Sequence, residues 1–197
     1  MMQMQPLTLT GKLVTLEPLT AAHHDGLVAA VRDGELWKLW YTAVPEPDAM
    51  AAEIRRRLAL QEAGSMLPFT ARRTDTGAVI GMTTYMNIDA DNHRLEIGST
   101  FNAAASQRSG TNAESKLLLL THAFEVLDCI AVEFRTHWMN LQSREAIARL
   151  GAKQDGVLRS HSRMADGSLR DTVVFSILAS EWLTVKRGLQ FRLARRG

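Results

Sequence analysis

The sequence predicts an α+β domain with one central, mixed and mostly antiparallel β-sheet flanked by helices. Two observations support this fold class. Apolar residues recur at helical spacing in the first and last thirds of the chain, whereas residues 69–101 form short strand-like runs separated by turns. No Pro/Gly/Ser-rich linker and no repeat divides the sequence, so residues 1–197 are expected to form a single domain.

The first third predicts one strand and two helices. Residues 13–16, Leu-Val-Thr-Leu, form a short opening strand. Thr20 is suited to cap the first helix, and Pro47 with Asp48 is typical of the start of the second.

The middle and the end predict a meander followed by alternating elements. Short turns after residues 69–73 and 79–88, with a third run at 94–101, indicate antiparallel strands. The later segments are a helix at 113–127, a strand at 130–138, a helix at 140–150 and a hairpin of 156–163 with 169–178. Asn140 is a good N-cap, and Gly151 follows the last periodic residue of its helix.

Composition excludes several classes of protein. Hydrophobic residues make up 46% and charged residues 22%, which is typical of a globular chain. No run approaches the roughly 20 apolar residues of a membrane helix, and the start does not resemble a secretory signal. The net charge is +2 with dispersed basic residues, which argues against a nucleic-acid partner.

The cysteine and histidine pattern indicates a cytoplasmic protein without a metal. Cys129 is the only cysteine, so an internal disulfide is impossible and a reducing compartment is expected. The six histidines lack metal-ligand spacing.

Residues 107–116, Gln-Arg-Ser-Gly-Thr-Asn-Ala-Glu-Ser-Lys, are the most informative segment. A strand ending at Phe101 leads through this polar loop into an amphipathic helix, whose first turn offers unpaired N–H groups to an anion. Gly110 permits close backbone approach, and Arg108 adds a positive charge. The alternative is an ordinary loop followed by a helix cap.

The loop resembles the coenzyme A-binding loop of the GCN5-related N-acetyltransferases (GNAT), and within them the ribosomal-protein N-terminal branch (RimJ/RimL-type). Gln107 and Gly110 match the family's Gln/Arg-x-x-Gly-x-Gly/Ala pattern, whereas Asn112 stands where Gly or Ala is usual. The resemblance implies that backbone amides of residues 108–113 hold the coenzyme A pyrophosphate. The residues of the implied loop are Gln107, Arg108, Ser109, Gly110, Thr111, Asn112 and Ala113.

Three further motifs carry the same resemblance. Residues 94–98, Arg-Leu-Glu-Ile-Gly, are similar to the family's strand that splays from its neighbour, so the backbone of Thr100, Phe101 and Asn102 would contact the pantetheine arm. Residues 140–151 are similar to its Asn-x-x-Ser…Leu-Gly signature, and residues 157–178 to the branch's last hairpin. The resemblance covers residues 8–183 and leaves a basic tail or helix at 184–197.

The implied activity is direct transfer of the acetyl group of acetyl-coenzyme A to a primary amine in a ternary complex. The acceptor is a protein N-terminus or a small molecule. Glu96 is the expected base, directly or through water, because it alternates with Leu95 and Ile97 and so faces away from them. The alternative is that Glu96 only pairs with a cation such as Arg94.

Ser143 is the expected acid for the leaving thiolate. It lies in the first turn of the helix that Asn140 caps, where the dipole favours negative charge, and this helix has no tyrosine for the role. Asn140 combines capping with a coenzyme contact. The alternative for Ser143 is a capping serine, and His137 is a reserve proton carrier.

Other features leave alternatives open. Trp37, Trp40 and Tyr41 form either core packing or a lip over the amine pocket. The tail forms a docked helix, a homodimer contact or a frayed end. Two rival functions are a non-catalytic acyl-coenzyme A-binding module and a nucleic-acid-binding domain that uses the tail.

Overall fold

The computed structural model describes residues 4–195. The strands are β1 (Leu9–Thr10), β2 (Val14–Pro18), β3 (Met66–Arg73), β4 (Val79–Asp89), β5 (Arg94–Asn102), β6 (Ala131–His137), β7 (Lys153–Arg163) and β8 (Leu169–Leu178). The α-helices are α1 (His24–Arg32), α2 (Met50–Glu62), α3 (Thr111–Glu125), α4 (Leu141–Leu150) and α5 (Ala179–Ala194). This order confirms the predicted succession of elements and adds the short strand β1 and the helix α5.

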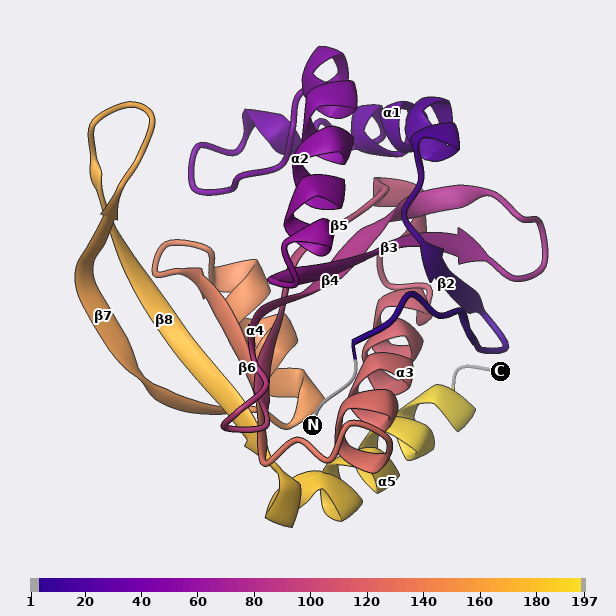
Figure 1. Cartoon of the computed structure of the whole chain (residues 1–197), viewed down its shortest axis with the longest axis vertical. Helices are drawn as coiled ribbons and strands as arrows, with labels where there is room; N and C mark the ends of the chain where they lie inside the picture. Colours follow the sequence, from indigo (N-terminus) through magenta and orange to yellow (C-terminus); the bar gives the residue numbers. More distant parts are fainter. Residues whose placement is uncertain (1–3, 196–197) are drawn as a thin grey trace.

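The strands form one eight-stranded sheet in the order β1-β2-β3-β4-β5-β6-β8-β7. Neighbouring strands are antiparallel except for β5 and β6, which are parallel. The predicted mixed, mostly antiparallel sheet is therefore confirmed. In Figure 1, α1 and α2 lie on one side of the sheet, α3 and α5 lie on the other, and the β7–β8 hairpin extends outward.

Two apolar clusters hold the helices on the sheet. Leu119 and Leu120 of α3 pack with Phe69, Tyr85 and other residues in the larger cluster. The smaller cluster packs α1 and α2 on the opposite face, where Met82 and Phe101 are buried. Because side chains alternate along a strand, residues next to each other in β4 and β5 serve different faces.

The C-terminal segment forms α5, which docks against α3. Trp182 stacks on Phe124 with ring centroids 5.2 Å apart, and its indole N–H donates a 2.7 Å hydrogen bond to Glu125. Leu189 is fully buried although Gly188 precedes it in the helix. Of the alternatives for this segment, the docked helix is observed, and it begins before residue 184.

His23, at the start of α1, is buried, and its ring contacts the Glu17 carboxylate and the Thr70 hydroxyl. No helix within residues 4–195 is both long enough and apolar enough to cross a bilayer.

Candidate active site

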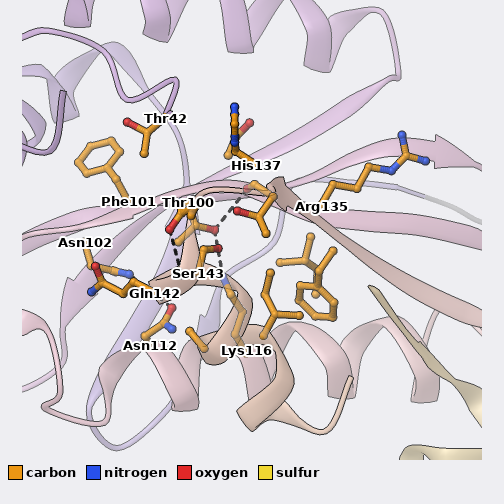
Figure 2. A pocket seen from close by; sticks show the side chains of 18 of the residues that line it. Thr42, Thr100, Phe101, Asn102, Asn112, Lys116, Arg135, His137, Gln142 and Ser143 are labelled. Carbon is orange, nitrogen blue, oxygen red and sulfur yellow. Dashed lines mark hydrogen bonds between the residues drawn. The ribbon is translucent and has the colours of Figure 1, made fainter. Parts of the chain in front are cut away.

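A cavity of about 1270 Å³ opens where β5 and β6 diverge. Its walls come from β4, β5, the loop before α3, β6, α4 and the β7–β8 hairpin. Figure 2 shows side chains of several of these elements around the cavity. A cavity of this size can take a drug-sized or larger ligand.

β5 and β6 diverge because they pair over only a short length. The two strands pair only at Arg94–Ala131, Leu95–Val132 and Glu96–Glu133. β5 continues to Asn102 without β6, and its register with β4 shifts near Ser99, whose φ is 47°. The edge of β5 that faces the cavity beyond Glu96 therefore has backbone N–H and C=O groups that β6 does not use.

The loop before α3 has the geometry of an anion site. Arg108 and Gly110 have φ of 61° and 95°, and the helix begins at the next residue, Thr111. The hydroxyls of Ser109 and Thr111 donate to the carbonyl of Ser106 at 2.6 and 3.2 Å, which fixes the loop from within. The first N–H groups of α3, and with them the positive end of the helix dipole, consequently lie at this end of the cavity.

Asn112 links this loop to β5. Its Oδ1 accepts a 3.4 Å hydrogen bond from Asn102 Nδ2, and Gln107 Nε2 donates to the Asn102 carbonyl at 3.5 Å. A glycine or alanine at position 112 could not make the first contact. The residue that departs from the family pattern thus ties the end of β5 to the first turn of α3.

The helix α4 supplies the opposite wall. Asn140 Oδ1 accepts a 3.0 Å hydrogen bond from the backbone N–H of Ser143, which confirms Asn140 as the N-cap. Gly151 ends the helix with φ of 105°, as predicted. The Ser143 hydroxyl is not the capping group and has no hydrogen-bond partner within residues 4–195. Both Asn140 and Ser143 line the cavity.

Glu96 lies at the end of the cavity where β5 and β6 still pair. Glu96 is 5% exposed. Its carboxylate accepts a 2.7 Å hydrogen bond from Asn87 and lies 3.5 Å from Arg135 Nε. Burial raises the pKa of the Glu96 carboxyl, an effect opposed by Asn87 and by the charge of Arg135. Arg94 pairs instead with Glu133, and the cation beside Glu96 is Arg135, so the alternative of an ion-paired Glu96 is present with a different partner.

His137, the last residue of β6, is buried in the protein. It is 4% exposed, and its Nδ1 accepts the N–H of Met139 at 3.0 Å, so the neutral ring carries its proton on Nε2. Nε2 is buried and has no hydrogen-bond partner within residues 4–195. Burial and then the charge of Arg170 lower the pKa of His137.

The aromatic residues after α1 take two different places, one in the core and the others beside the cavity. Trp37 packs against the smaller core cluster. Trp40 contacts His137 with ring centroids 5.2 Å apart and is 55% exposed, and Tyr41 lines the cavity. Trp40 and Tyr41 are thus placed beside the cavity, whereas Trp37 is packing.

Two buried basic residues, Arg57 and Lys116, were not expected from the sequence. Arg57 on α2 donates to Thr84 Oγ1 at 2.7 Å and to the Ser99 carbonyl at 3.1 Å. Lys116 on α3 is 6% exposed and lines the cavity. Lys116 precedes Leu120 by four residues on the apolar face of α3, and a lysine in that position is the signal that could have marked it.

The structure therefore gathers most of the expected residues on one cavity. Its lining includes Glu96, Thr100, Phe101, Asn102, Gln107, Arg108, Gly110, Asn112, Ala113, Asn140 and Ser143. Ser109 and Thr111 do not line it, because their side chains turn into the loop. Within residues 4–195, no group of three or more His, Cys, Asp or Glu side chains could hold a metal ion.

The comparisons with known proteins agree with this geometry. Residues 14–153 match the family model of the acetyltransferase (GNAT) domain. No curated protein sequence matches the chain.

Several solved structures are similar over nearly the whole chain. A protein from T. thermophilus assigned as an acetyltransferase is 34% identical, with a TM-score of 0.85 over 98% of this chain and 100% of the other. A GCN5-related N-acetyltransferase from Brucella melitensis is 29% identical, with a TM-score of 0.85 over 96% and 86%. A protein from Vibrio cholerae assigned as a ribosomal-protein-serine acetyltransferase shares the fold at 19% identity, with a TM-score of 0.76 over 89% and 99%.

Proposed function

The chain belongs to the GNAT acetyltransferase family and is an acetyltransferase that acts on an amine, and we propose that all 197 residues serve one N-acetyltransferase domain using acetyl-coenzyme A. The acceptor is a primary amine, either a protein N-terminus or a small molecule. Transfer occurs by direct attack while both substrates are bound. The single cysteine supports a reducing, cytoplasmic location.

The observation that carries the coenzyme assignment is the loop-to-helix junction at Gly110. Its left-handed backbone turns the chain so that α3 begins directly at the cavity. Residues 108–113 would hold the pyrophosphate through backbone amides, with the dipole of α3 adding favourable charge. The open edge of β5 at Thr100, Phe101 and Asn102 would bind the pantetheine arm, and Asn140 would contact it from α4.

Glu96 is proposed as the proton acceptor. The amine nitrogen forms a bond to the thioester carbonyl carbon, the C–S bond breaks, and its electron pair goes to sulfur. A protonated amine cannot attack, so a group must first remove its proton. Glu96 is buried beside the cavity, and its raised pKa brings it closer to neutral pH than an exposed carboxylate.

Ser143 is proposed as the acid for the leaving thiolate, through a hydrogen bond from its hydroxyl to the sulfur. Its hydroxyl has no other partner within the described chain, and the capping bond is made by its backbone N–H rather than by its side chain. It lies in the first turn of α4, where the dipole favours an anion.

The test is release of free thiol from acetyl-coenzyme A in the presence of a panel of amines. We expect acceptor-dependent thiol release and a mass increase of the accepting amine by one acetyl group. Coenzyme binding without any acceptor-dependent release would instead favour a regulatory module.

A further inference from the structure

Lys116 is a buried ionisable group in the cavity wall that has no role in the proposed function so far. Its side chain runs from the second turn of α3 toward the sheet, and Nζ lies 3.0 Å from both Thr83 Oγ1 and Thr100 Oγ1. Figure 2 shows Lys116 reaching toward Thr100 across the cavity wall, with Ser143 also labelled there. Thr100 lies on the part of β5 that β6 does not cover.

The hydrogen bonds around Nζ use two of its three N–H or lone-pair directions and leave the third unused. Thr83 and Thr100 are 2.7 Å apart, and Thr100 Oγ1 lies 3.3 Å from the Gly98 carbonyl. Each hydroxyl has one proton, so Thr83 donates to Thr100, Thr100 donates to Gly98, and both accept from Lys116. Nζ has three positions besides Cε. Two are used by the threonines, and the third is an N–H when Lys116 is charged and a lone pair when it is neutral.

No negative charge balances this amine. Within residues 4–195, Lys116 has no ion pair, and its polar partners are hydroxyls. The other charged side chains and histidines that line the cavity are Arg57, Glu96, Arg108, Arg135, His137, Glu145, Arg149, His161, Arg170 and Arg192. None of these lies within ion-pair distance of Nζ. Burial alone lowers the pKa of Lys116 to about 7.

An amine in this position destabilises the fold rather than stabilising it. Burying an ammonium without a partner costs free energy, and a methionine of similar length would fill the same space without that cost. Unfavourable groups of this kind cluster at functional sites. The environment suits an ammonium that meets an anion formed only during the reaction.

We propose that Lys116 is the cation that stabilises the leaving thiolate of coenzyme A. This inference rests on the proposed function, because it requires the thioester sulfur to lie in the cavity. As the C–S bond breaks, its electron pair stays on sulfur, and the open N–H of Lys116 donates a hydrogen bond to the thiolate that forms. Lys116 stays charged, and the sulfur takes its proton through the Ser143 hydroxyl, which regains one from solvent as the thiol leaves. Ser143 acts from α4, whereas Lys116 supplies the positive charge from α3.

The experiment follows the thiol of coenzyme A bound to the protein, so it needs neither the acceptor nor turnover. Coenzyme A binding is measured by calorimetry, and the ultraviolet absorbance of its thiolate is measured across pH for wild type, Lys116→Met and Lys38→Met. Lys38 is an exposed lysine paired with Glu35, outside the cavity, and serves as the matched control.

In wild type and Lys38→Met, we expect the bound thiol to ionise roughly one to three pH units below free coenzyme A, the usual effect of an adjacent opposite charge. In Lys116→Met, coenzyme A still binds and this shift is lost. An unshifted wild-type thiol, or a shift that survives in Lys116→Met, overturns the inference. Absence of coenzyme A binding to wild type overturns the proposed function itself.

If Lys116→Met does not fold, Lys116→Gln, which keeps a hydrogen-bond donor for Thr83 and Thr100 but no charge, takes its place and should also lose the shift. With an acceptor in hand, the rate profile gives a second readout. Lys116 must be charged to stabilise the thiolate, so wild-type kcat falls on the alkaline side, and Lys116→Met has a lower kcat without that alkaline fall. A structural role for Lys116 would lower the melting temperature but leave the shape of the profile unchanged.

Discussion

Replacing Glu96 by glutamine removes the proposed proton acceptor with almost no change in shape. The amide oxygen can still accept the hydrogen bond from Asn87, which is 2.7 Å from the carboxylate in the native protein. Arg135 loses its 3.5 Å contact with Glu96 but keeps Glu133 at 2.9 Å. The fold should therefore tolerate the change.

The stability change has a predicted sign. Because the folded-state pKa of Glu96 is raised, the folded protein holds this proton more tightly than the unfolded chain does. The ionised carboxylate therefore lowers stability as the pH rises above the unfolded value of about 4.3, and a neutral glutamine does not. The melting temperature of Glu96→Gln at pH 7 should equal or exceed that of wild type, and the difference should shrink at acidic pH.

In contrast to the melting temperature, the activity of Glu96→Gln should fall, and by a large factor. General base catalysis contributes about 10²- to 10⁴-fold, so kcat/KM for the acceptor should fall by at least about 100-fold at pH 7. An α-amine with a pKa of about 7.8 is roughly one-seventh neutral at pH 7 and almost wholly neutral at pH 9. About sevenfold of the loss should therefore return between pH 7 and pH 9.

The assay is thiol release across pH, with Glu133→Gln as the matched control. Glu133 faces Glu96 across β5 and β6 and shares Arg135, but it does not line the cavity. Glu133→Gln should keep turnover at pH 7 within about threefold of wild type, and its acidic limb should move to lower pH because the charge of Glu133 helps to raise the pKa of Glu96. Turnover of Glu96→Gln within about threefold of wild type at pH 7 would refute the assignment, since solvent or another group would then take the proton.

Three other variants test the remaining parts of the site. Ser143→Ala should lower kcat by about 10²-fold with an unchanged melting temperature, because the cap uses the backbone N–H, and intact kcat would leave Ser143 without a role in turnover. Asn140→Ala should instead lose roughly 1 kcal/mol of folding stability, measured by denaturant unfolding, and an unchanged midpoint would contradict the cap assignment. Gly110→Val should abolish coenzyme A binding in calorimetry, whereas Gly167→Val, which places the same strained residue in the turn of the β7–β8 hairpin at φ of 85°, should keep it. Equal affinities of the two glycine variants for coenzyme A would show that the pyrophosphate does not bind to this loop.

Much of the fold could be predicted because local patterns and tertiary packing agree. The strand-forming residues of 79–88 and the helical spacing in residues 113–127 match β4 and α3 within a few residues. Asn140 and Gly151 set the ends of α4 through local backbone chemistry, which depends little on the rest of the chain. Gly110 marked the loop for a similar reason, since its positive φ favours glycine.

The parts that were missed depend on contacts between distant residues. Lys116 is functional in this account because α3 directs it at Thr83 and Thr100, which lie 33 and 16 residues earlier in the chain. Arg57 meets Thr84 across 27 residues, and His23 is buried by Thr70 across 47. Periodicity assigns a residue to a helix face, but it does not show which strands that face will meet.

A crystal structure of the protein with coenzyme A bound tests the central claim most directly. The account predicts the pyrophosphate within hydrogen-bond distance of backbone amides of residues 108–113. It places the pantetheine arm along β5 beyond Glu96 and the sulfur in contact with Lys116 and Ser143. Coenzyme A bound elsewhere, such as in the apolar groove beside Leu117 and Val126, would contradict the account.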